Sequence, residues 1–302
     1  MSTVVRASQA ATAEPGKANI VDSKRGRVRK RLTRGLSITV LVVTAIFLIL
    51  PFITLFITSL KLDSEYNRWP ITFFPKVAQW ENYVRVFEMT PYGKVMIRTA
   101  LLGIAYATII TTTSAMAGYG FARCRVRASG PIFGIVVAML IIPGIVLTIP
   151  QFILYARLGL TNTYWPWILG ALGASPFYIF LFRQFFLTFP RELEEAAEVD
   201  GAGPLRIFAQ IFVPNSLAVI ATVMFFAFSS VWGDYLTPLI YLNDDKMLLP
   251  VVLQRNFRNP QNITIVTVAS AAAILYILPP MVAFFIAQKN ILKGVVMSGI
   301  KG

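Results

Sequence analysis

The sequence predicts an all-α integral membrane protein with six transmembrane helices, and its composition and its apolar runs carry this prediction. Apolar residues make up 56% of the 302 positions and charged residues only 14%, far from the averages of soluble domains. Six runs contain no charged residue, and each is long enough for a membrane span, which needs roughly 20 residues. A backbone in lipid must satisfy its own hydrogen bonds, and the period-two alternation of a membrane barrel is absent, so we expect helices. The runs are Gly35–Leu60, Thr99–Ala122, Ala128–Ala156, Leu158–Phe182, Ile207–Gly233 and Asn259–Gln288.

A basic segment precedes the first run. Residues 1–35 hold nine Lys and Arg residues and two acids, so their net charge of +7 is half of the total of +14. We expect a disordered cytoplasmic tail here, followed by a membrane domain at residues 36–302 whose first run is an anchor, not a cleaved signal peptide. Nucleic-acid binding is disfavoured because aromatic residues and a folded scaffold are missing. Contact with anionic lipid headgroups and a positive-inside signal both fit the charge, and we favour the signal.

The charges of the later loops set the orientation of the other runs. With the N-terminus inside, the loop after the second run lies inside and holds Arg123, Arg125 and Arg127, whereas the loop after the third run lies outside and holds one arginine. The central loop and the C-terminal tail also fall inside and are basic, as the positive-inside rule requires. The sequence therefore places both termini in the cytoplasm. The segment Lys61–Arg98 falls outside, where its tryptophans and prolines suggest a structured loop on the membrane surface.

Several kinds of chemistry lack their residues in this sequence. There is no histidine, which removes the commonest general base and metal ligand, and Cys124 is the single cysteine, which excludes an intrachain disulfide. We expect no catalytic residue, no metal site and no cofactor. The chain has no GxxxxGK[ST] loop to hold the phosphates of ATP, so uphill transport driven by ATP would need a separate ATPase.

A polar stretch at about residues 190–214 interrupts the apolar second half of the chain and predicts two short helices. Acidic residues crowd its first turns, where the helix dipole favours negative charge. Gly201 stands where a helix can end in a left-handed residue. Pro204 then suits the first turn of a second helix, which reaches Pro214. The acids are Glu192, Glu194 and Glu195.

The same stretch resembles the EAA loop of the membrane subunits of ABC importers. The family pattern is Glu-Ala-Ala, three residues, Gly, nine residues, Ile, two residues and Pro, and each of these positions is matched. Asp200 stands directly before the glycine, where sugar-importer relatives also tend to have an aspartate. Val213, directly before the proline, replaces the usual leucine. The resemblance implies that the loop couples partner ATPases to the membrane domain. The residues that it assigns to coupling are Glu192, Glu195, Ala196, Ala197, Asp200, Gly201, Ile211 and Pro214.

Two further segments resemble carbohydrate permeases of the maltose type. The fifth run ends in Trp-Gly-Asp-Tyr-Leu, where the family commonly has Trp-Asn-Glu/Asp-Phe/Tyr-Leu, so Gly233 departs from the pattern. This end of the run is a candidate for the substrate path, because a tryptophan ring can stack on a sugar and a carboxylate can accept its hydroxyls; an interfacial aromatic residue and a hydrated acid are the simpler interpretation. The candidates are Trp232, Asp234 and Tyr235. The tail at residues 290–302 is similar to the family's ATPase-docking tail, which assigns docking to Gly299, Lys301 and Gly302.

Together these observations predict one membrane subunit of a binding-protein-dependent ABC importer, in a bacterial inner membrane, that imports a sugar or an oligosaccharide. The resemblance implies two ATPase subunits or an ATPase homodimer, a second permease subunit that is a different chain, an extracellular solute-binding protein and membrane lipid as partners. Two alternatives stay open: an ion-coupled secondary carrier, although the runs carry no ionisable group in their interiors, and an ABC importer for a non-sugar solute. A membrane enzyme acting on lipid-linked substrates would need acids or a base at membrane depth, which the runs lack.

Overall fold

The computed structural model of the chain describes residues 18–70, 72–124 and 127–299, with side chains from residue 33 to residue 290 within these ranges. The elements in this part of the chain are helices, joined by loops and by one isolated antiparallel bridge between Arg258 and Thr264. The prediction of an all-α fold is confirmed for the described residues. The chain divides into two units, Met1–Thr54 and Leu55–Gly302.

Helix α1 (Ala18–Ser59) contains the first predicted run and is long and apolar enough to cross a membrane between Thr33 and Ser59. It begins at Ala18, so the described part of the N-terminal segment is helical where the sequence analysis expects disorder. The physical reason is local: the stretch from Ala18 to Arg34 contains no proline and is rich in lysine and arginine, which are good helix formers.

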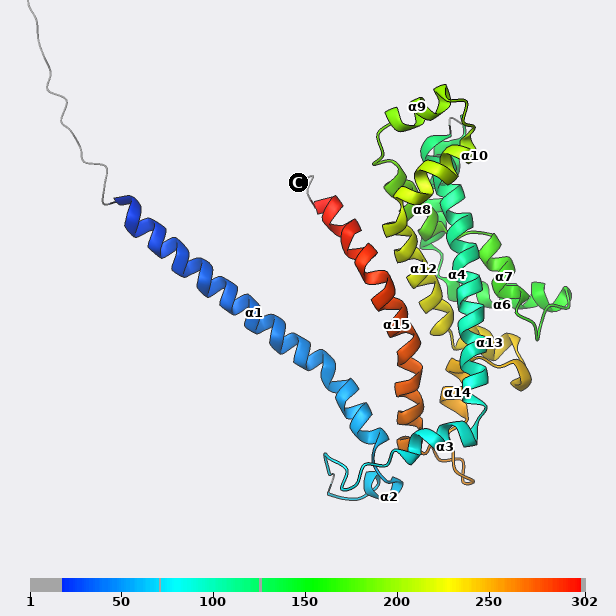
Figure 1. The fold of residues 1–302 in the computed structure, drawn as a ribbon. Coiled ribbons are helices and arrows are strands. Elements are labelled where there is room, and N and C mark those ends of the chain that lie inside the picture. Colours follow the sequence, from blue (N-terminus) through cyan, green and yellow to red (C-terminus); the bar gives the residue numbers. More distant parts are fainter. Residues whose placement is uncertain (1–17, 71, 125–126, 300–302) are drawn as a thin grey trace, which may run out of the picture. The chain divides into compact units, whose positions relative to one another are not determined.

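Four helices of the second unit carry most of its packing. Helix α4 packs against α8 and α12, and α12 also packs against α15 (Figure 1). The contact between α4 and α8 is close because Gly118 has no side chain: a Cβ atom there would lie 2.6 Å from the Cβ of Phe182. Small residues at such contacts are typical of helix packing in membranes. The four helices are α4 (Tyr92–Arg123), α8 (Pro176–Phe186), α12 (Leu217–Trp232) and α15 (Val266–Gly299).

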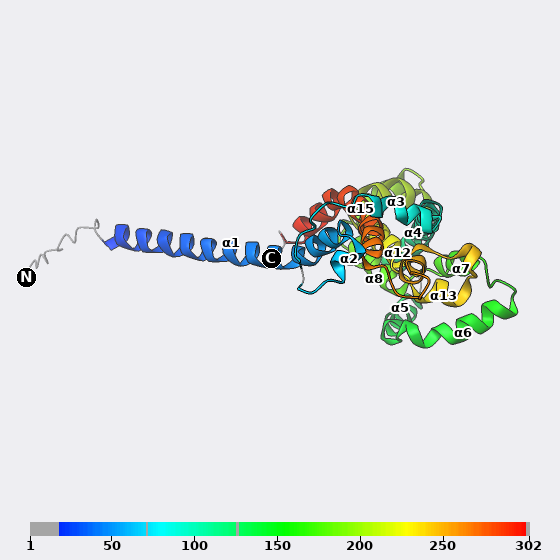
Figure 2. The ribbon, with the colours of Figure 1, turned by 90° about the horizontal axis from the view of Figure 1, so that it is seen from below.

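The third predicted run is not one straight helix, and its two halves are bent by 99°. The break lies at Ile142 and Pro143, whose backbones are extended, with ψ values of 116° and 126°. A proline disfavours the helical conformation of the residue before it, which explains the position of the bend. Figure 2 shows α6 at the edge of the second unit, away from α15. The run forms α5 (Ser129–Ala138), the 3₁₀ turn η1 (Met139–Ile141) and α6 (Gly144–Arg157).

The fourth predicted run, Leu158–Phe182, lies too far toward the N-terminus and contains a turn. Helix α7 (Trp165–Leu172) and helix α8 are joined by three residues, of which Ala174 has a positive φ of 58°. The candidate span that the two helices form runs from Trp165 to Phe186. The residues before α7 form a loop with two further positive-φ positions, so the helix starts later than the apolar run.

The fifth predicted run contains the end of one helix and the whole of another. The first is continuous from α10 (Pro204–Ile207) through the π-helical turn η2 (Phe208–Phe212) to α11 (Val213–Asn215), and α12 follows after a bend of 83°. The side chains of Asn215 and Ser216 stabilise this bend, because they donate hydrogen bonds to the carbonyls of Ile211 (2.7 Å) and Phe212 (2.6 Å). These carbonyls lie at the end of the helix, where intrahelical donors run out.

The described residues thus contain four helices that are long and apolar enough to span a membrane, or six candidate spans if each bent pair counts as one. At one end of the second unit lie α9 (Glu192–Val199) and α10, which we call the α9 end (Figure 1). Several short elements lie toward the other end, which we call the α13 end, and two of them make the predicted outer segment structured. They are α2 (Asp63–Tyr66), α3 (Glu81–Met89), α13 (Leu236–Tyr241), η3 (Asp244–Lys246) and α14 (Leu249–Arg255).

Candidate functional site

The predicted helix, turn and helix at the α9 end are confirmed. Gly201 has a φ of 77°, a left-handed conformation that only glycine adopts at little cost. The amide of Ala202 donates to the carbonyl of Ala197 (2.9 Å), and the amide of Gly201 donates to the carbonyl of Glu198 (3.0 Å). This pair of bonds is the Schellman motif, which ends a helix and turns the chain. The turn therefore has a defined geometry and presents α9 as a rigid element.

The coupling residues predicted from the sequence divide into an exposed and a half-buried group. Ala197 and Ile211 are half-buried and pack against the core of the bundle. The remaining six are exposed: Glu192, Glu195, Ala196, Asp200, Gly201 and Pro214. The turn also exposes two apolar side chains that the sequence reasoning did not select, Val199 (88% exposed) and Leu205 (73%). The sequence signal that could have identified them is the presence of apolar residues within a charged loop.

Arg123, at the last residue of α4, joins three elements. Its Nη1 atom lies 2.9 Å from Oε1 of Glu194 in α9, and the two side chains are only 6% and 15% exposed. Its Nε and Nη2 atoms donate to the carbonyl of Phe186, and Nη2 also donates to the carbonyl of Phe189 (2.6 Å). From the sequence, this arginine is predicted only to add positive charge to a cytoplasmic loop. No local signal could have shown the contacts, because they come from segments more than 60 positions apart.

An aromatic cluster holds α10 and η2 against the bundle. The ring of Phe212 lies 4.9 Å from that of Tyr119, 5.3 Å from that of Phe186 and 5.1 Å from that of Phe189, between centroids. Phe186 and Phe212 are buried. The pairs of Phe212 with Tyr119 and Phe186 are edge-to-face, and such pairs add about 0.5–1.5 kcal/mol each beyond their burial. The second helix of the loop is thus packed tightly on α4 and α8.

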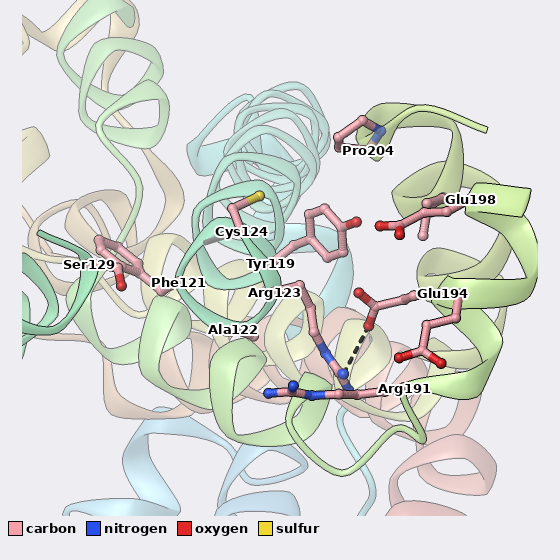
Figure 3. Close-up of a pocket in the computed structure, with 12 residues that line it drawn as sticks. Tyr119, Phe121, Ala122, Arg123, Cys124, Ser129, Arg191, Glu194, Glu198 and Pro204 are labelled. Carbon is pink, nitrogen blue, oxygen red and sulfur yellow. Dashed lines mark ion pairs between the residues drawn. The ribbon is translucent and has the colours of Figure 1, made fainter. Parts of the chain in front are cut away.

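A cleft of about 470 Å³ separates α9 from the end of α4 (Figure 3). Figure 3 shows the ion pair of Arg123 and Glu194 inside it and the carboxylate of Glu198 on the side of the Tyr119 hydroxyl. Burial raises the pKa of Glu194 above its ordinary value, and Arg123 opposes this rise. In the part of the chain with described side chains, no group of three or more His, Cys, Asp or Glu residues could hold a metal ion.

The predicted substrate-path residues lie at the end of α12 and before α13, where one is buried and two are half-buried. Trp232 is 2% exposed, and its Nε1 atom donates to the carbonyl of Tyr276 (3.1 Å) while the Tyr276 hydroxyl donates to the carbonyl of Trp232 (2.6 Å). Asp234 and Tyr235 are half-buried, and Asp234 accepts a hydrogen bond from the amide of Thr237 at the start of α13 (3.0 Å). The carboxylate is therefore used as a helix cap here.

Most of the predicted docking residues lie outside the residues that the structure describes. Gly299 is the last residue of α15, and Lys301 and Gly302 lie outside the described residues.

Residues 112–296 match the family described as the binding-protein-dependent transport system inner membrane component. The chain belongs to this family. The matched range begins in α4 and ends in α15, so this permease carries the Arg123 contacts and the α9 end within its family domain. The basic N-terminal segment lies outside the match.

Named relatives extend the likeness over most of the permease. It is 32% identical to the lactose transport system permease protein LacG of Rhizobium radiobacter over 277 residues, which cover 90% of this chain and 98% of the relative. It is 29% identical to the melibiose/raffinose/stachyose import permease protein MelC of Bacillus subtilis (strain 168), over 84% of this chain and 91% of the relative. In structure it resembles a chain of a bacterial ABC transporter involved in the import of alginate, with a TM-score of 0.72, 20% identity and coverage of 86% of this chain and 97% of the other.

Proposed function

We propose that this chain is one membrane subunit of an ABC importer for a sugar or an oligosaccharide. The observation that carries the proposal is the exposed α9–Gly201 turn, which matches the EAA pattern in a chain without a phosphate-binding loop. Relatives named for lactose and for melibiose, raffinose and stachyose support the substrate class. The energy would come from ATP hydrolysed by another protein.

The proposed complex has two ATPase subunits at the α9 end, a second permease subunit that is a different chain, and a solute-binding protein at the α13 end. Each bent helix pair counts as one span, which makes six, with both termini in the cytoplasm of a bacterial cell. Residues 1–35 form a cytoplasmic tail, and residues 290–302, with Gly299, Lys301 and Gly302, dock on an ATPase.

The proposed mechanism assigns different tasks to the two groups of loop residues. The exposed side chains, such as Glu195 and Asp200, contact the ATPase, while Ala197 and Ile211 connect the loop to the bundle. Closure of the ATPases on ATP then displaces α9, and the bundle follows, so that the substrate cavity opens to the opposite side of the membrane. Such a displacement needs a loop that does not deform, and the Schellman turn and the aromatic cluster support this requirement.

The test is an assembled complex in proteoliposomes, formed with the ATPase, the second permease subunit and the solute-binding protein. ATP hydrolysis is measured against a panel of mono-, di- and oligosaccharides, each with the binding protein present. We expect at least one saccharide to stimulate hydrolysis and to be taken up. Stimulation only by a non-sugar solute would correct the substrate class, and uptake that needs no ATPase but is abolished by an uncoupler would establish an ion-coupled carrier instead.

A further inference from the structure

We propose that Arg123 is the joint through which α9 moves α4 and α8 together. The proposal rests on the proposed function and adds a positioning residue outside the EAA loop. It states that the ion pair between Arg123 and Glu194 transmits force, in addition to the backbone that links α8 to α9.

The need for such a joint follows from the chain connections. The backbone links α9 to α8 on one side and to α10 on the other, but α4 ends at Arg123 and has no direct chain link to α9. A push on α9 reaches α4 only through side chains. Among the described residues, Arg123 to Glu194 is the one ion pair between these two helices.

The guanidinium group is suited to this task. Its five N–H donors lie in one plane in a fixed fork, so one side chain can bind a carboxylate and two carbonyls at once. Here Nη1 lies 2.9 Å from Glu194. Nε and Nη2 donate to the carbonyls of Phe186, the last residue of α8, and Phe189, three residues later. The guanidinium group also contacts an aromatic ring: the Arg123 Cζ atom lies 5.4 Å from the centroid of Phe212. The guanidinium group of α4 thus has partners in α8, in the loop after α8, in α9 and in η2.

Helices α4 and α8 are in turn joined closely enough to move as one body. Gly118 allows the two backbones to approach, since a Cβ atom there would also lie 3.1 Å from the amide nitrogen of Arg183. Arg183 in α8 donates to the carbonyl of Phe121 in α4 (3.4 Å), the reverse of the contact that Arg123 makes. Further along α4, the amide of Ser175, the residue before α8, donates to the hydroxyl of Ser114 (3.1 Å). A displacement of the Arg123 end is therefore carried along both helices.

The ion pair is poorly explained as a device for stability alone. Both partners are largely buried, and the cost of removing two charges from water can equal or exceed their attraction. Consistent with this, burial raises the pKa of Glu194 even though an arginine is in contact with it. A pair that gives the fold little net stability but connects two moving elements is expected to matter for coupling.

The experiment uses the complete complex in proteoliposomes and compares Glu194→Ala with Glu198→Ala. Both glutamates lie in α9 and line the same cleft, and alanine preserves the helix, but Glu198 makes no ion pair among the described residues. The readouts are substrate molecules imported per ATP hydrolysed and the thermal stability of the complex. We expect E194A to lower the transport ratio by about two- to thirtyfold, the range that network mutations produce, with ATP hydrolysis retained and E198A close to wild type.

The conservative variant Arg123→Lys tests whether coupling needs the planar guanidinium group or only a positive charge at this position. Lysine keeps the positive charge but lacks the planar fork, so we expect a reduced ratio for R123K as well. Wild-type transport ratios in both E194A and R123K would overturn the proposal, and so would a failure of both variants to assemble, since the pair would then be structural. Absence of ATP-driven uptake in the wild type would instead overturn the proposed function.

Discussion

Packed aromatic rings occur at both ends of the second unit, but the polar contacts of the α9 end and the α13 end differ. At the α9 end, a buried ion pair and a cluster of aromatic rings join four elements. At the α13 end, side chains bind backbone carbonyls of loops: Arg98 donates to the carbonyl of Asp245 (2.8 Å), and Tyr164 donates to the carbonyl of Lys246 (3.0 Å). The ion pair between Arg255 and Asp244 there is wide, at 3.7 Å, and exposed.

This difference shows where the molecule is built to transmit force and where it is built to adapt. Packed rings and buried charges have few alternative arrangements, so a displacement on one side is passed to the other. Hydrogen bonds from half-buried side chains at the surface to loop carbonyls can exchange with water at less cost than contacts in the core. We therefore interpret the α9 end as rigid and the exposed loop contacts of the α13 end as adaptable, which suits the proposed fixed contact with an ATPase and the proposed transient contact with a binding protein.

The largest effect is expected from Gly118→Ala, which disturbs the close packing of α4 on α8 below the rigid α9 end. The added methyl group would lie 2.6 Å from the Cβ of Phe182. Both atoms are attached directly to the backbones of packed helices, so neither can move aside freely. Overpacking of this kind costs about 1–3 kcal/mol, so we expect a lower melting temperature in detergent and loss of ATP-driven uptake.

The matched control is Gly120→Ala in the same helix, where nothing lies within 4 Å of an added Cβ atom. Alanine is favoured over glycine in a helix by about 0.5–1 kcal/mol, so this variant should be as stable as wild type or slightly more so. Equal melting temperatures for G118A and G120A would show that α4 and α8 are not held as described.

The next largest effect is expected from Gly201→Val at the exposed tip of the α9 end. A φ of 77° is strongly unfavourable for a β-branched residue, at a cost of about 1–2 kcal/mol or more, so the Schellman turn should open and α9 should change direction. We expect uptake to be lost while the protein still inserts and its bundle still melts near the wild-type temperature. The measurement is ATP-driven uptake beside membrane content by immunoblot.

Gly203→Val tests whether any added side chain in the loop has this effect. Gly203 has an ordinary φ of −75° and open space around its Cα atom, so valine fits without strain. Uptake near wild type for G203V beside a loss for G201V supports the turn as the cause. Equal uptake by both variants would contradict it.

The elements that the sequence predicted well are those with local signals. The α9–Gly201–α10 turn has acids, a glycine and a proline in a short stretch, and each acts on its own neighbours. The angles of the bends could not be predicted, because an apolar run indicates how long a segment is but not its direction: the third run turns at Ile142 and Pro143, and the fifth at Ser216. The role of Arg123 depends on three elements meeting in space, so no reading of nearby residues could supply it.

A smaller effect, and one that depends on pH, is expected from Glu194→Gln at the buried pair. Because burial raises the pKa of Glu194 in the folded protein, this group favours the fold at acidic pH and loses that contribution as pH rises through the raised value. Glutamine stays neutral. The melting temperature of E194Q relative to wild type should therefore rise from acidic toward neutral pH, with Glu198→Gln as the control. A relative stability that falls over this range would mean that the Arg123 contact outweighs burial.

The smallest effect is expected from Asp244→Asn, which removes the exposed pair at the α13 end. Asp244 is 92% exposed and its distance to Arg255 is 3.7 Å, so water already solvates both charges. Surface pairs of this kind contribute about 0–1 kcal/mol, and we expect the melting temperature and the transport ratio to stay near wild type. A loss of uptake in D244N with an unchanged melting temperature would locate a partner contact at this residue. The negative charge of Asp244 would then serve binding of another protein and not the stability of the fold.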